Sequence, residues 1–85
     1  MIIKTIFSPN CSKKTRKNNE IKFIILHYTG MQSEIVSLRR LLESKNKVSC
    51  HYLINRKGSI IKLVNENRVA WHAGKSRWKN YRNLN

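Results

Sequence analysis

Three histidines are the residues of this sequence best suited to chemistry. His27, His51 and His72 each carry an imidazole, which binds metals or moves protons near neutral pH. Three imidazoles with an open fourth position would form a zinc site of the hydrolytic kind. Such a site also needs an acceptor for the proton of the bound water, and here Glu66 or a tyrosine are the candidates. His51 is equally able to face a backbone carbonyl, so both interpretations stay open.

His27 occupies the most informative position of the three. It closes the unbroken apolar run 23–26, which lies between Lys22 and Gly30. Such a run predicts an interior strand over residues 21–26, and a nitrogen ligand at its carboxyl end would be held on a rigid element. On spacing alone the alternative is a structural histidine that only donates or accepts a hydrogen bond.

The cysteines and tryptophans give weaker signals. Cys50 and His51 are neighbours, and neighbours in a strand point to opposite faces, so a Cys-His dyad is not expected. Cys11 lies far from Cys50 without CxxC spacing, which indicates reduced thiols. Trp71 and Trp78, among basic residues, are able to stack on a base or a sugar; alternatively, one fills the core and the other lies on the surface.

The elements that must position these residues can be predicted from the chain pattern. Residues 2–6 indicate a short edge strand, and the basic stretch 13–19 a surface loop. Residues 52–55 and 59–64 predict a hairpin whose turn uses Gly58 for a positive φ. Residues 65–85 show little periodicity. Gly30, after Thr29, is expected to break the preceding strand.

One amphipathic helix is predicted between the first strands and the hairpin. Ser33 is the expected N-cap, Glu34 suits the first turn, and apolar residues recur at helical spacing. The apolar stripe, expected to cover one face of the sheet, comprises Ile35, Leu38, Leu41 and Leu42. This order of elements predicts an α/β fold with a mixed central sheet and a flanking helix.

Size and charge set further bounds. With 85 residues the chain forms at most one domain with a thin core. The 18 Lys and Arg against four acids give a net charge of +14, which indicates an anionic polymer as partner or, equally, a codon bias towards lysine. No secretory signal and no membrane span are visible, so a cytoplasmic location is expected, or a periplasmic one if the amino terminus is misassigned.

A series of short motifs resembles one protein family. The motifs are ordered and correctly spaced over essentially all 85 residues. They are Ser8-Pro9-Asn10, residues 24–31 (IILHYTGM), residues 48–54 (VSCHYLI), Gly58-Ser59-Ile60, Leu63-Val64, residues 70–76 (AWHAGKS), Trp78 and Leu84-Asn85. The series is similar to the zinc-dependent N-acetylmuramoyl-L-alanine amidases of the amidase type 2 family, which share the fold of the peptidoglycan recognition proteins.

The resemblance implies a fold, a reaction and a cofactor. Residues 1–85 would be the amino-terminal part of a single amidase type 2 domain, incomplete at its carboxyl end. The reaction is hydrolysis of the amide between the lactyl group of N-acetylmuramic acid and L-alanine, in peptidoglycan or anhydro-muropeptides, during wall degradation or muropeptide recycling. Zinc is the implied cofactor. His27 matches the first histidine ligand, Trp71 and His72 border the substrate cleft, and His51 takes a structural position.

The resemblance also implies what the sequence does not contain. In the family a catalytic Glu, a second His, an Asp or Cys ligand and an assisting Lys follow the position of Leu84-Asn85. We therefore expect little or no amidase activity from these 85 residues, because one imidazole with waters binds zinc weakly. The alternatives are a non-catalytic peptidoglycan-binding module and, less favoured, a small basic nucleic-acid-binding protein.

Overall fold

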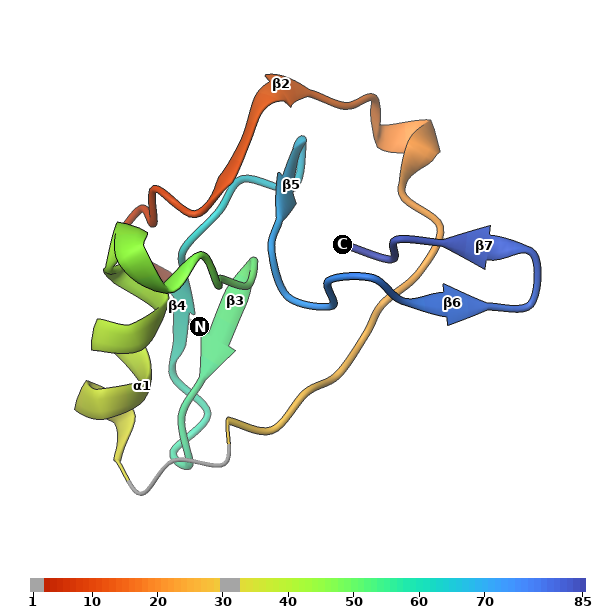
Figure 1. The fold of residues 1–85 in the computed structure, drawn as a ribbon. Coiled ribbons are helices and arrows are strands. Elements are labelled where there is room, and N and C mark those ends of the chain that lie inside the picture. Colours follow the sequence, from red (N-terminus) through yellow and green to blue (C-terminus); the bar gives the residue numbers. More distant parts are fainter. Residues whose placement is uncertain (1–2, 30–32) are drawn as a thin grey trace.

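A mixed three-stranded sheet with one helix beside it forms the centre of the molecule (Figure 1). The computed structural model describes residues 3–29 and 33–85. The strand order is β1 (Ile3–Thr5), β4 (Ile60–Lys62), β3 (Tyr52–Ile54). β1 runs parallel to β4, and β3 runs antiparallel to it. The predicted α/β class with a mixed sheet and a flanking helix is confirmed, as is the edge strand near the amino terminus. The predicted start of that strand, Ile2, lies outside the described residues.

The β3–β4 hairpin is confirmed in detail. The Asn55 side-chain oxygen accepts from the backbone N–H groups of Lys57 and Ser59, at 3.0 and 2.9 Å. Gly58 has a φ of +84° and donates its N–H to the carbonyl oxygen of Asn55. A side-chain oxygen that stabilises the loop and a glycine that accepts the left-handed conformation make this turn a local property of the sequence.

Helix α1 (Glu34–Leu42) is capped as predicted and is followed by a short 3-10 turn, η2 (Ser44–Asn46). The Ser33 hydroxyl accepts from the N–H of Val36 at 3.2 Å. Leu38, Leu41 and Leu42 pack against the core. The expectation that Ile35 belongs to the buried stripe is wrong, since this side chain is 69% exposed. A three-residue strand is about 10 Å long and a nine-residue helix about 13 Å, so the first turn has little sheet beneath it.

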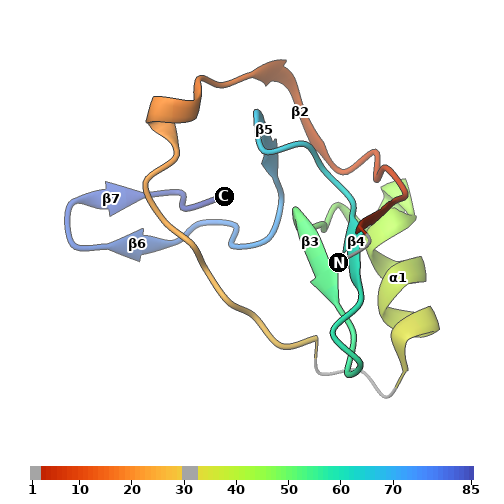
Figure 2. The same cartoon turned by 180° about the vertical axis from the view of Figure 1, so that it is seen from behind.

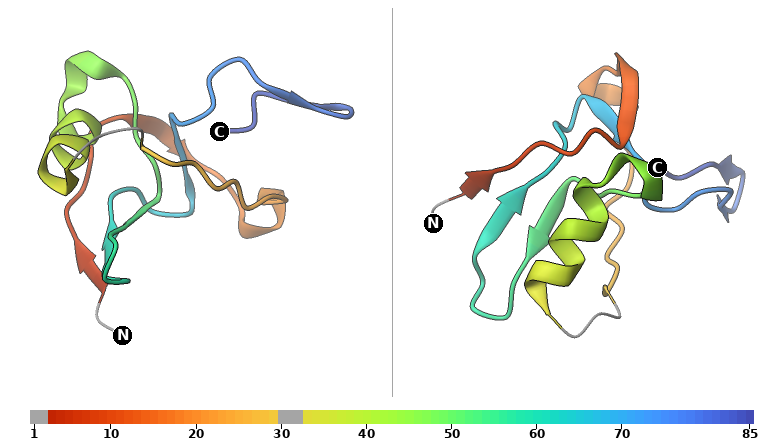
Figure 3. Two further views of the ribbon diagram at one scale, coloured as in Figure 1. Left: turned by 90° about the horizontal axis from the view of Figure 1, so that it is seen from below. Right: turned by 60° about the vertical axis from the view of Figure 1, so that its left-hand side comes forward.

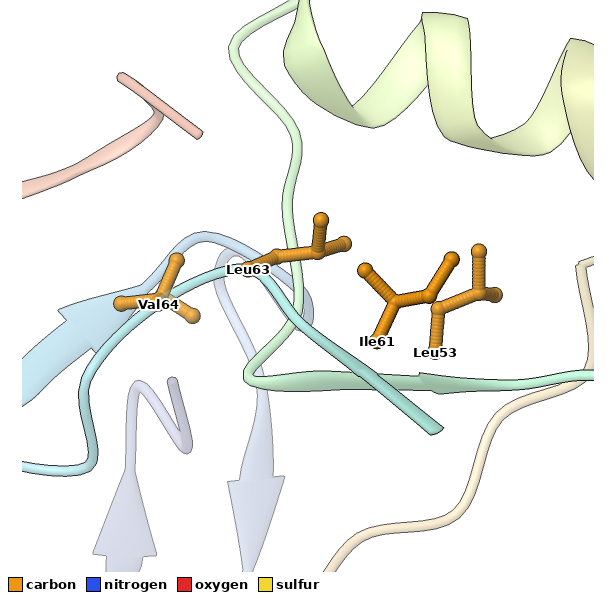
Figure 4. Packing of buried hydrophobic residues seen from close by; sticks show 5 residues of the cluster. Leu53, Ile61, Leu63 and Val64 are labelled. Carbon is orange, nitrogen blue, oxygen red and sulfur yellow. The ribbon is translucent and has the colours of Figure 1, made fainter. Parts of the chain in front are cut away.

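The core is small and lies between the sheet and α1. Its buried apolar members are Leu53, Ile61, Leu63, Val64 and Ala70. In Figure 4 the side chains of Leu53, Ile61 and Leu63 point towards the helix, whereas Val64 lies on the side of β5 (Arg68–Ala70). A core this thin leaves each buried residue with a large share of the total stability.

The segment between β1 and α1 ties the helix to the sheet. Asn10 is 1% exposed, and its side-chain nitrogen lies 2.8 Å from the carbonyl oxygen of Val48, 3.0 Å from that of Glu43 and 3.3 Å from that of Leu41. The Ser8 hydroxyl also donates to the Leu41 carbonyl. The last carbonyls of a helix have no partner within the helix, and Ser8 and Asn10 supply donors to them. The Glu43 carbonyl also accepts from the backbone N–H of Asn46.

Strand β2 (Cys11–Thr15) corrects the prediction of a loop over residues 13–19. It pairs antiparallel with β5 (Figure 2), and the 3-10 turn η1 (Asn18–Glu20) follows it. The guanidinium of Arg68 donates to the carbonyl oxygens of Ser12 and Lys13, and the Ser12 hydroxyl accepts from the N–H of Val69. The strand depends on contacts with residues that are distant in sequence, and its own polar residues give no strand signal.

The extended segment 21–29 overturns the prediction of an interior strand over residues 21–26. The structure assigns it no strand, and Ile24 and Leu26 are 92% and 88% exposed. Figures 1 and 2 show it crossing from η1 towards the start of α1 as an arc that stands apart from the sheet. The apolar run is strand-like in composition, but within the described residues it has no neighbouring strand to pair with. The predicted breaker Gly30 lies outside the described residues.

The carboxyl-terminal region carries a small hairpin that the sequence did not indicate. β6 (Arg77–Trp78) pairs with β7 (Tyr81–Arg82), and this hairpin projects from the rest of the molecule (Figure 3). The Phe23 ring meets the Tyr81 ring edge-on, with centroids 4.9 Å apart. This contact attaches the extended segment 21–29 to β7. Among the described residues no helix combines the length and hydrophobicity that a membrane crossing requires.

Candidate functional site

Two of the three histidines meet although they lie far apart in sequence. His27 comes from the extended segment 21–29, and His72 from the loop between β5 and β6. His27 Nε2 lies 3.1 Å from His72 Nδ1, and the ring centroids are 5.3 Å apart with the planes inclined by 60°. One of these nitrogens donates to the other, so the two imidazoles form a hydrogen-bonded pair.

The third histidine has a different role. The Nε2 atom of His51 lies 2.9 Å from the carbonyl oxygen of Arg68 and donates to it, while Arg16 Nη2 is 3.3 Å away. The ring centroid of His51 lies 6.2 Å from that of His72. In residues 3–29 and 33–85 no group of three or more His, Cys, Asp or Glu side chains is placed to hold a metal ion. The backbone contact considered for His51 is thus present, whereas the three-histidine site is not formed.

The loop that carries His72 is fixed by a single side chain. Asn85 Oδ1 accepts from three consecutive backbone N–H groups, those of His72, Ala73 and Gly74, at 3.0, 2.7 and 3.2 Å. Gly74 has a φ of +57°, which lets the chain curl so that the three N–H groups converge. Converging backbone N–H groups form a concave site for an oxygen atom, and here the amide oxygen of Asn85 occupies it.

The surroundings of His72 favour its neutral form. Burial lowers the pKa of His72 below its ordinary value, and the positive charges of His27, His51 and Arg16 lower it further. At neutral pH the ring therefore keeps a nitrogen lone pair that can bind a metal or accept a proton.

A large cavity adjoins the histidine pair. It has a volume of about 850 Å³ and lies between the extended segment 21–29, the β3–β4 hairpin and the end of the chain. All three histidines line it, together with aromatic rings and charged side chains of both signs. These are Phe23, Tyr52, Tyr81, Arg16, Lys22, Arg82, Glu20 and Glu66. Such a mixed lining can bind a ligand that carries both sugar or peptide groups and negative charge.

The carboxylate considered as proton acceptor, Glu66, faces this cavity but has a partner. Glu66 Oε1 accepts from the Tyr52 hydroxyl at 2.6 Å. That hydrogen bond is the main cause that raises the pKa of Tyr52, and partial burial and the negative charge of Glu66 add to it. Glu66 is therefore engaged by a phenol that stays protonated at neutral pH.

Cys50 and His51 do not form a catalytic dyad. The Cys50 thiol lies 3.3 Å from the carbonyl oxygen of Tyr52, whereas His51 donates to the carbonyl of Arg68. Burial raises the pKa of the Cys50 thiol to about 11, so the nucleophilic thiolate is scarce near neutral pH. Both Cys11 and Cys50 are free thiols, as predicted.

This shift gives a pH-dependent prediction. The pKa of Cys50 rises from 9.0 to about 11 on folding, so the folded state disfavours the thiolate. The contribution of the neutral thiol to stability is complete below pH 9 and is lost as the pH rises through 11. We expect the thermal midpoint of the wild type to fall over this range more steeply than that of Cys50→Ala. Parallel declines in thermal melts at pH 8 to 11 would contradict the prediction.

The two tryptophans lie in different surroundings. The backbone of Trp71 is fixed by Ser49, whose N–H donates to the Trp71 carbonyl and whose hydroxyl accepts from the Trp71 N–H, both at 2.9 Å. The Trp71 side chain is half-buried and is not among the residues that line the cavity, unlike that of His72. Trp78 is 58% exposed on β6. The substrate-contacting roles of Trp71 and His72 and the metal-binding role of His27 stay predictions.

The fold and the site together define a class of protein. A small α/β domain carries a polar and aromatic cavity with a histidine pair among the residues that line it, and such a site suits the hydrolysis or binding of a polar polymer. The chain belongs to the N-acetylmuramoyl-L-alanine amidase family, amidase type 2, whose model matches residues 17–85. The predicted family is thereby confirmed, and membership implies the fold of the peptidoglycan recognition proteins.

A curated relative supports the same assignment. The chain is similar to the N-acetylmuramoyl-L-alanine amidase AmiD of Escherichia coli (strain K12), with 36% identity over 74 residues. The match covers 76% of this chain and 25% of AmiD, so the chain spans about a quarter of the length of that relative. No solved structure matches the chain significantly.

The zinc ion associated with this family can be tested against the residues present. His27, the expected ligand, lines the cavity, and its Nε2 lies 3.1 Å from a second imidazole nitrogen, His72 Nδ1. A hydrolytic zinc site uses three protein ligands, and the described residues place no such group together. The residues therefore fit part of a zinc site rather than a complete one.

Proposed function

We propose that this protein is derived from zinc-dependent amidases that hydrolyse the bond between the lactyl group of N-acetylmuramic acid and L-alanine in peptidoglycan or its fragments. Membership of the amidase family supports the reaction, and the position of His27 at the cavity supports its role as a zinc ligand. Trp71 and His72 would lie beside the glycan or the peptide. The observation that carries the proposal is the meeting of His27 and His72 at an 850 Å³ cavity.

Each residue of the site has a distinct task in this proposal. A zinc ion held at His27 would polarise the scissile carbonyl and activate a water molecule. His72, neutral because of its burial, can accept a proton or a hydrogen bond from the substrate. Arg16 and Arg82, which also line the cavity, attract the carboxylates of a stem peptide.

We further propose that the 85-residue chain alone turns over little or no substrate. The described residues bring together no third metal ligand, and Glu66 is engaged by Tyr52. Loss of a general base alone lowers a rate by about 10²–10⁴. Weak metal retention by fewer than three ligands adds to that loss.

The test is a hydrolysis assay with a muropeptide and added zinc, in which the release of the peptide is followed by chromatography. We expect no release above the zinc-only blank, whereas E. coli AmiD, as positive control, should cleave the same substrate. Turnover that disappears in His27→Ala would contradict the proposed inactivity while supporting the zinc role of His27. Turnover that persists in this variant would contradict that role.

A second candidate function, retention on the wall polymer without catalysis, is favoured by the charge distribution. The net charge is +14, and one ion pair, between Lys45 and Glu43 at 3.5 Å, is present within the described residues. Arg16 and Arg68 bind backbone carbonyls, but many of the other basic side chains are exposed and available to an anionic glycan.

Pull-down with purified peptidoglycan tests this candidate. Trp71→Ala should lower retention several-fold, about as much as the loss of one stacking contact. Trp78→Ala is the matched control, because Trp78 lies on the projecting β6–β7 hairpin, and it should retain wild-type binding. Equal losses in both variants, or steeply salt-dependent binding to DNA without any preference for peptidoglycan, would argue against a wall-binding role.

A further inference from the structure

The histidine pair has the spacing of two ligands on one metal ion. Zinc–nitrogen bonds are about 2.0–2.1 Å long, and two such bonds at a tetrahedral angle place their nitrogens about 3.3 Å apart. His27 Nε2 and His72 Nδ1 are 3.1 Å apart. The two rings already meet through nitrogens rather than carbons. Loss of the proton that the pair shares and a rotation of each ring by about 35° would direct both lone pairs at a shared ion.

We infer that His27 and His72 together form a two-nitrogen binding site for a divalent transition metal, with His72 in the place of a second protein ligand. The inference rests on the proposed role of His27 and adds a role for His72 that family membership does not supply. Water or a ligand in the adjoining cavity completes the coordination, since the described residues place no third His, Cys, Asp or Glu at the pair.

Contacts outside the pair hold the loop of His72 and attach the segment that carries His27. On the His72 side, Asn85 Oδ1 binds the N–H groups of residues 72–74, the first of which belongs to His72 itself. On the His27 side, the Phe23 ring lies edge-on against Tyr81 of β7. The Asn85 contacts fix the backbone from which the His72 imidazole extends, and such support raises metal affinity because less order is lost on binding.

His51 stands apart from the pair. Its Nε2 donates to the carbonyl oxygen of Arg68, and the cationic Arg16 lies 3.3 Å from the same nitrogen. The ring centroid of His51 lies 6.2 Å from that of His72, and the described residues place no third His, Cys, Asp or Glu with the pair. The site therefore has two nitrogens rather than three, and its affinity is correspondingly moderate.

Zinc titration by isothermal calorimetry of the full chain, with ¹⁵N NMR of the imidazole rings, tests this inference. We expect one zinc ion per chain and movement of the His27 Nε2 and His72 Nδ1 resonances. His27→Ala and His72→Ala should each weaken binding about tenfold or more, as should Asn85→Ala, with recovery in Asn85→Asp, which keeps an oxygen acceptor. His51→Asn, shown to be folded by circular dichroism, should bind as the wild type does.

The outcomes separate this inference from the proposed function. Wild-type affinity in His72→Ala with loss in His27→Ala would overturn the role of His72 and leave that of His27 intact. Wild-type affinity in His27→Ala would overturn both. A loss in folded His51→Asn as large as that in His72→Ala would replace the two-nitrogen site by a three-imidazole one.

Discussion

Leu63→Ala is expected to remove most of the folding free energy of this domain. Leu63 is fully buried, follows β4 directly and points towards α1 (Figure 4). Truncation of a buried leucine to alanine costs about 2–5 kcal/mol. Small domains lie near the lower end of the usual range of about 5–15 kcal/mol, so the variant should be largely unfolded at 37 °C.

Urea unfolding followed by circular dichroism measures this effect. Ile54→Ala is the matched control, because Ile54 lies on β3 of the same sheet but is 60% exposed. Its free energy of unfolding should change by no more than about 0.5 kcal/mol. Similar unfolding midpoints for the two variants would mean that the buried cluster around Leu63 does not stabilise the domain.

Asn10→Ala has the second largest expected effect. The Asn10 side-chain nitrogen has two N–H groups for three carbonyls. The shorter hydrogen bonds, to Val48 and Glu43, are therefore the main ones, and the Leu41 carbonyl shares one of these N–H groups. Ser8 can still serve the Leu41 carbonyl in the variant. The Glu43 carbonyl keeps the N–H of Asn46 as a donor. The Val48 carbonyl would lose its side-chain donor, and a buried group left unpaired costs about 1–3 kcal/mol.

The same unfolding experiment, with two further variants, tests the role of Asn10. Asn10→Asp keeps the shape but replaces the donor by an oxygen, so it should destabilise the domain at least as much as Asn10→Ala. Asn46→Ala removes a single solvent-accessible bond to the Arg40 carbonyl and should cost well under half as much. If Asn10→Asp were as stable as the wild type, the three carbonyl contacts would carry no stability.

The elements that local chemistry determines were predictable from the sequence. Ser33 caps α1, and Gly58 and Asn55 form the β3–β4 turn, in each case through contacts within a few residues. Elements that depend on distant partners were not. β2 forms because Arg68 binds its backbone from more than fifty residues away, and residues 21–26 lack a strand to pair with despite their apolar composition.

The candidate site was predictable in part for the same reason. The placement of His27 after an apolar run, together with the family motifs, singled this residue out, although the strand that should carry it is an unpaired segment. Nothing in the 45-residue separation of His27 and His72 indicates that their rings meet. Asn85 gave no chemical signal in the sequence, since its role depends on three backbone N–H groups that converge only in the folded loop.

The parallel pairing of β1 with β4 has a consequence for how the chain folds. Ile3 is opposite Ile60, so the sheet closes only after a loop of 57 positions has been brought together. Bringing residues so far apart in sequence together costs chain entropy before their contact stabilises the fold, and this cost slows folding. During synthesis β1 emerges before its partner and stays unpaired until the hairpin that carries β4 has been made.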